Sequence, residues 1–145
     1  MRDQLEISNL IHKYARLVDE GDFGGIGKLF SGGRIIFSDG INDTEVSGAA
    51  DITSMYENTT RRYGDGTPKT HHVTSNIELR IDGESAYGTS YYTVFQQLPD
   101  FPLQPIIAGV YFDEFYRTED EWFFKVRSIK VSLLGDTSRH LLIIL

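Results

Sequence analysis

The apolar residues of the first twenty positions fall on one helical face. They follow the i, i+3, i+4, i+7 spacing: Ile7, Leu10, Ile11, Tyr14, Leu17 and Val18. This pattern predicts a helix over residues 3–20, with Asp3 as its N-cap and Gly21 as its end. Asp22 is then expected to cap a short second helix, which three glycines weaken.

A third helix is expected over residues 49–62. The remaining apolar segments favour strands, short ones at 34–38 and 44–47 and long ones at 69–81, 85–98, 106–117 and 122–133. Asp82 and Gly83 predict a tight hairpin, whereas the three prolines of 99–105 predict a longer connection that interrupts pairing. Helical signals come first and strand signals last, so the fold class is α+β.

Two adjacent histidines open the longest strand. In a regular strand they face opposite sides, and counting by twos puts His71 on the same side as Ile77 and Ile81. This count predicts that His71 faces the core and that His72 does not. Either imidazole could hold a proton near neutral pH beside a carboxylate, or could be a hydrogen-bonded structural group.

Length and charge narrow the possible functions. The chain has 145 residues, enough for a single domain over 1–145. Its formal net charge of −7 disfavours nucleic acid and anionic membrane surfaces as partners. No apolar run approaches the ~20 residues of a membrane span, and the N-terminus does not resemble a signal peptide. We therefore expect a cytoplasmic protein.

Asp19 is the first candidate for chemistry. It lies at the C-terminal end of the predicted first helix, where the helix dipole disfavours negative charge and can raise a carboxyl pKa. The alternative is a solvated acidic helix end formed with Glu20 and Asp22. The chain has no cysteine, and its four histidines lack the spacing of a metal pair, so we expect no metal site.

Three segments, in this order and spacing, carry a family resemblance. They are YARLVDEGD from Tyr14 to Asp22, KTHHVTSN from Lys69 to Asn76, and VYFDEFYR from Val110 to Arg117. The pattern resembles the SnoaL-like branch of the nuclear-transport-factor-2-like superfamily over nearly the whole chain. That branch includes scytalone dehydratase, bile-acid 7α-dehydratase and lindane dehydrochlorinase. The resemblance implies a cone-shaped barrel in which a strongly curved mixed or antiparallel sheet wraps three N-terminal helices.

The resemblance also implies a cofactor-free lyase or isomerase with an Asp–His pair inside the cone. Asp19 and His72 match the family residues, which is compatible with the strand only if a bulge near its start re-aims the side chain. Tyr14 and Arg127 complete the expected catalytic set. We expect a small hydrophobic organic ligand, bound by His71, Phe37, Met55, Tyr92 and Tyr111.

Two alternatives remain open at this point. The superfamily also contains noncatalytic members, such as the β subunits of ring-hydroxylating dioxygenases, so the cone could hold a ligand or serve in assembly. The aromatic strand residues, Tyr92 and Tyr111 among them, could equally be plain core. We also expect a homodimer or homotrimer, because the outer sheet face and the apolar tail Leu141–Leu145 need cover.

Overall fold

The computed structural model describes residues 2–145. It contains three helices, α1 (Arg2–Glu20), α2 (Phe23–Leu29) and α3 (Ala49–Thr59). The six strands are β1 (Arg34–Ser38), β2 (Asp43–Ser47), β3 (Thr70–Asp82), β4 (Ser85–Leu98), β5 (Phe101–Thr118) and β6 (Glu121–Leu134). None of the helices within 2–145 has the length and apolar character needed to cross a bilayer.

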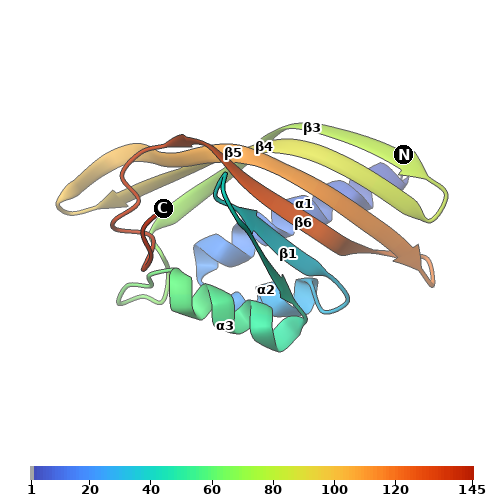
Figure 1. The fold of residues 1–145 in the computed structure, drawn as a ribbon, viewed down its shortest axis with the longest axis horizontal. Helices are drawn as coiled ribbons and strands as arrows, with labels where there is room; N and C mark the ends of the chain where they lie inside the picture. The colour runs from blue at the N-terminus through green and yellow to red at the C-terminus, as the bar shows by residue number, and fades with distance from the viewer. Residues whose placement is uncertain (1) are drawn as a thin grey trace.

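All six strands form one sheet in the order β2-β1-β6-β5-β4-β3. The β1–β6 pair is parallel and the other pairs are antiparallel. The sheet arches over the helices, as Figure 1 shows. The expected α+β class and the mixed, curved sheet are confirmed, but the sheet is open, with β2 and β3 as free edges, and is not a closed barrel.

Helix α1 packs against the sheet through the stripe that its spacing predicts, with Ile7, Ile11 and Tyr14 among its buried residues. Gly21 ends it with a φ of 73°, a left-handed conformation that glycine adopts without strain. The N-cap prediction for Asp3 is wrong. Asp3 lies within the helix, and its carboxylate accepts a hydrogen bond from Trp122 Nε1 at 3.0 Å.

The region of the three prolines differs from the sequence prediction. Strand β5 begins at Phe101 and includes Pro102 and Pro105. The β4–β5 pairing shifts register twice here, and Pro105 lies at one of the shifts. Proline is tolerated at such irregular positions because its missing N–H is not needed for the ladder. Pro102 and Pro105 therefore lie within β5 and do not end its pairing with β4, whereas Pro99 lies in the short turn between the two strands.

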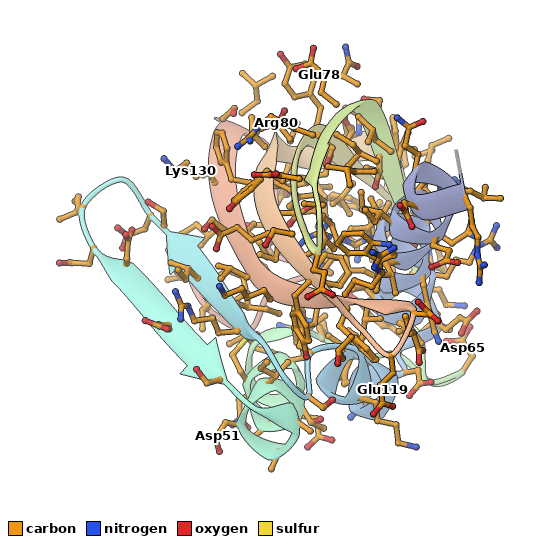
Figure 2. The ribbon with its side chains drawn as sticks, turned by 90° about the vertical axis from the view of Figure 1, so that its right-hand side faces the viewer. Asp51, Asp65, Glu78, Arg80, Glu119 and Lys130 are labelled. Atoms are coloured by element: carbon orange, nitrogen blue, oxygen red, sulfur yellow. The ribbon has the colours of Figure 1, made fainter. Side chains whose placement is uncertain are left out.

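A bulge in β3 decides which histidine faces inward. The β3–β4 register shifts between Ser75 and Glu78, and Asn76 has a φ of 54°. The extra residue exchanges the two faces of the strand, so the count that put His71 on the core side with Ile77 is wrong. His72 lies inward and His71 is exposed. Figure 2 shows Glu78 and Arg80, beyond the bulge, at the far side of the sheet from Asp51 on α3.

The C-terminal segment after β6 covers one end of the helical layer. It descends from the sheet to the end of α3 and the loop before β3 (Figure 1). Thr60 and Leu141 form an isolated antiparallel bridge, and Arg61 N–H donates to the His140 carbonyl at 2.8 Å. Helix α3 consequently ends at Thr59 instead of residue 62. The tail is paired as far as Leu142, beyond which its side chains are exposed.

Candidate functional site

Asp19 and His72 meet where the end of α1 crosses the start of β3. The Asp19 carboxylate accepts three hydrogen bonds, from His72 Nδ1 at 2.6 Å, the His72 backbone N–H at 2.8 Å and Thr70 Oγ1 at 2.9 Å. The His72 side chain is 8% exposed and the Asp19 side chain 23%. Both oxygens of the carboxylate are thus held by hydrogen bonds, and the imidazole is oriented through its Nδ1.

These contacts assign the protons of the pair. Burial acts to raise the Asp19 pKa, but the hydrogen bonds and charge of His72 outweigh it and hold the pKa below its usual value. Asp19 is therefore a carboxylate that only accepts, and the His72 Nδ1 must carry the proton of that bond. In the neutral form of the ring the lone pair therefore resides on Nε2, the nitrogen available to take up a proton.

A surface groove of about 360 Å³ between α1 and β3 leads to this pair. Its lining is mostly polar: His12, Ala15, Arg16, Asp19, Glu20, His71, His72 and Thr74. His71 lines the groove from the outer face of β3 and makes no hydrogen bond to Asp19. His72, whose side chain is otherwise buried, is thus among the residues that border an open groove.

His140 is a site residue that the sequence analysis missed. Its ring centroid lies 6.2 Å from that of His72, the rings are nearly perpendicular, and its side chain is buried. Burial, with the charge of His72, lowers the His140 pKa to about 3, although Asp19 acts in the opposite direction. In the sequence His140 appears only as the first residue of an apolar tail, 68 positions from His72, so no spacing rule connects the two.

Stability should therefore fall in mild acid because of His140. The unfolded chain binds a proton at His140 below pH ~6.5, whereas the folded chain does so only near pH 3, so unfolding gains a proton between these values. The free energy of unfolding is expected to drop by up to ~1.4 kcal/mol per pH unit as the pH falls from 6.5. Urea unfolding of the wild type and of His140→Phe at pH 7, 6 and 5 checks this. Equal slopes for the two proteins would contradict it.

Tyr14 and Arg127 lie deeper, in an aromatic cluster between α1 and the sheet. The Tyr14 hydroxyl is hydrogen-bonded to that of Tyr56, and burial raises the Tyr14 pKa. Arg127 Nε and Nη2 donate to the two Asp113 oxygens at 2.8 and 2.9 Å, and its guanidinium lies 3.7 Å from the Tyr111 ring centroid. Burial acts to lower the Arg127 pKa, but Asp113 raises it, so the guanidinium stays charged.

The other candidate binding residues belong to the core. Tyr92 and Tyr111 are buried and stacked, with ring centroids 4.5 Å apart, and the Tyr92 hydroxyl donates to the Lys130 carbonyl. Phe37 and Met55 are half-buried against the same core. None of these four lines the groove that reaches His72. Over residues 2–145, no group of three or more His, Asp or Glu side chains is arranged to hold a metal ion.

Comparison with known proteins gives a family match and many structural matches. A family model described as a SnoaL-like domain matches residues 1–128. No curated protein sequence matches the chain significantly. An NTF2-like protein with a cystatin-like fold from Novosphingobium aromaticivorans superposes with a TM-score of 0.73 at 20% identity, covering 95% of this chain and 86% of that one.

Two further structures have similar values. A proposed scytalone dehydratase from Novosphingobium aromaticivorans gives a TM-score of 0.72 at 18% identity, over 92% of this chain and 87% of that one. LinA gives 0.72 at 18% identity, over 92% and 88%. At such identities the superpositions establish a shared NTF2-like fold, and the family membership comes from the sequence match.

Proposed function

Since the chain belongs to the SnoaL-like family, whose fold includes dehydratases, isomerases and ring-hydroxylase subunits, we propose that it is a cofactor-independent lyase or isomerase. It would act by proton abstraction on a small hydrophobic cyclic substrate. The observation that carries this proposal is the 2.6 Å bond between His72 Nδ1 and Asp19, which leaves Nε2 as the basic nitrogen. Such a pair is the arrangement required of an oriented general base.

In the proposed reaction His72 Nε2 removes a proton from a ring carbon next to an electron-withdrawing group. The electron pair of the broken C–H bond forms a double bond, and either a leaving group departs with its own electron pair or the proton returns at another carbon. Asp19 stabilises the imidazolium that forms, because its negative charge lies against Nδ1. The residues described supply both the base and its orienting group.

Tyr14 and Arg127 would act on the substrate oxygen or leaving group. Arg127 uses Nε and Nη2 on Asp113, and its buried Nη1 has no hydrogen-bond partner within the part of the chain described. A buried guanidinium with a spare donor can stabilise charge that develops on an oxygen. Tyr14 stands beside it, with the Arg127 guanidinium 4.5 Å from its ring centroid. Both roles require the substrate, or a rearranged aromatic cluster, to reach this depth.

Exchange of acidic carbon-bound protons tests the proposal without knowledge of the natural substrate. The probe is 2-tetralone, a bicyclic ketone with exchangeable protons next to the carbonyl. Incubated in D₂O with the protein, it is expected to lose its ¹H signals at these carbons faster than with the same protein heat-denatured. The measurement is ¹H NMR over a pH range of 6 to 8. An exchange rate independent of native protein concentration would argue for a noncatalytic function.

A noncatalytic binding or assembly module is the second candidate. The observation in its favour is the filled interior, in which Tyr14 contacts the rings of Phe30, Tyr56 and Tyr111 edge to face. A structural neighbour named as an aromatic ring hydroxylase superposes at a TM-score of 0.71. The exchange experiment separates the two candidates, because a module of this kind has no need of an oriented base.

A further inference from the structure

Four buried side-chain atoms have no hydrogen-bond partner among residues 2–145. They are Ser90 Oγ, Gln96 Oε1, Arg127 Nη1 and His140 Nδ1. Leaving a buried polar atom unpaired costs free energy, and native structures contain few such atoms. Each one therefore calls for an explanation by its surroundings.

The sheet register separates these atoms into two groups. Ser90 pairs with Tyr111, beside the Asp113–Arg127 pair, and so belongs to the deep cluster. Gln96 pairs with Thr70, two residues from His72, and its Nε2 donates at 3.0 Å to the carbonyl of Arg139. Gln96 and His140 are thus the pair that lies at the Asp19–His72 end of the interior.

The protein holds His140 there firmly. Its backbone N–H donates to the Thr137 carbonyl and its carbonyl accepts from Arg61. The next residue but one, Leu142, donates to the Thr59 carbonyl at 2.9 Å. On the other side, Gln96 holds the Arg139 carbonyl and also that of Pro68. The imidazole is therefore held close to His72, although its buried Nδ1 has no hydrogen-bond partner in the protein to offset the cost of burial.

The state of the His140 ring suits hydrogen bonding more than proton transfer. Burial keeps it neutral over the whole physiological range, whereas Asp19 orients the neighbouring ring of His72 as the base. A neutral imidazole offers one N–H donor and one acceptor, and a neutral ring can polarise a carbonyl without competing for the substrate proton.

We propose that His140 binds an oxygen substituent of the substrate, a ring carbonyl or hydroxyl, through Nδ1 while His72 removes the proton from the adjacent carbon. His140 does not line the groove, so the oxygen has to enter the buried interior beside His72 to reach Nδ1. This inference rests on the proposed function. It narrows the substrate class to cyclic compounds that carry oxygen and disfavours halogenated or plain hydrocarbon rings. In a ketone, the carbonyl oxygen and the carbon that loses the proton are close together. The imidazoles of His140 and His72 are also close together, so one could bind the oxygen while the other faces the carbon.

Binding of two matched probes tests it. These are 2-tetralone and tetralin, which share a bicyclic skeleton and differ in the oxygen. His140→Phe, which keeps ring size and removes both nitrogens, is expected to weaken 2-tetralone binding about three- to tenfold, the loss of one hydrogen bond. It should change tetralin binding less than about twofold. Leu142→Ala, in the same segment, is the control and should leave both affinities unchanged. The dissociation constants come from ligand titrations followed by protein NMR.

Two polar variants keep the test decisive if His140→Phe does not fold. The amide nitrogen of Asn occupies the place of Nδ1, and that of Gln the place of Nε2. His140→Asn should retain most of the 2-tetralone affinity and His140→Gln should lose it. Unchanged 2-tetralone affinity in the Phe or Gln variant would overturn the inference, as would failure of the wild type to bind 2-tetralone in preference to tetralin.

The same titrations separate this inference from the proposed function. Affinity that depends on His140 without any deuterium exchange would mean that the oxygen site exists and the reaction does not. Exchange that proceeds equally in wild type and His140→Phe would mean that the base works without this contact, and the inference would fail alone.

Discussion

Replacing His72 by asparagine is expected to slow proton exchange from 2-tetralone by about 10²–10⁴-fold, the usual contribution of a positioned general base. The amide nitrogen of asparagine takes the place of Nδ1 and can still donate a hydrogen bond to Asp19, so the start of β3 should keep its structure. Asparagine has no nitrogen that accepts a proton near neutral pH, so the C–H bond cannot be broken by this side chain. The exchange rates are measured by NMR, and circular dichroism checks that the variant is folded.

Two companion variants identify the base. Asp19→Asn removes the negative charge that lies against Nδ1 and should slow exchange in the same direction. His71→Gln alters the exposed neighbour, which has no bond to Asp19, and should have a much smaller effect. A large loss in His71→Gln together with full activity in His72→Asn would assign the base to His71 and contradict the orientation set by the bulge.

Asp113→Ala is expected to lower the free energy of unfolding by about 3–5 kcal/mol, the typical result of breaking a buried ion pair from one side. The Arg127 side chain is fully buried, and Asp113 is the partner of its Nε and Nη2. Without the carboxylate the guanidinium remains charged among the rings of Tyr14, Tyr111 and Phe124. Urea unfolding followed by tryptophan fluorescence measures the change.

The double variant Asp113→Leu/Arg127→Met is the control for this prediction. It removes both charges and fills the space with apolar side chains, so much of the lost stability should return. A single variant that is as stable as the wild type would mean that water reaches Arg127 and that the pair is less buried than the structure indicates. Against a total stability of typically 5–15 kcal/mol, the expected loss is easily resolved.

Much of the fold could be predicted from the sequence because its signals are local. The apolar spacing of α1, the glycine at position 21 and the cap at Asp22 each act within a few residues, and Asp22 does accept a hydrogen bond from Gly25 at 2.9 Å. The inward direction of His72 does not follow from such local signals. Strict alternation favoured His71, and only the bulge at Asn76, seen in the pairing of β3 with β4, reverses the count.

Other parts of the candidate site depend on contacts between distant segments. Asp113 and Arg127 are opposite each other only because β5 and β6 pair in one register, and the spacing of residues in the sequence does not predict this register. His140 reaches His72 because the tail folds back to bridge Thr60. A single histidine at the start of an apolar tail gives no signal of this kind. Asp113 and His140, which reach the site through pairing between distant segments, are therefore the residues that the sequence analysis does not name.

The bulge of β3 has a second effect, on association between molecules. β3 is an outer strand of an open sheet, and a straight outer strand presents a continuous row of backbone donors and acceptors to which another chain can add. The shift between Ser75 and Glu78 interrupts that row near its middle, and the charged side chains of Glu78 and Arg80 follow it. The irregularity that turns His72 inward thus also protects the exposed edge against strand addition and aggregation.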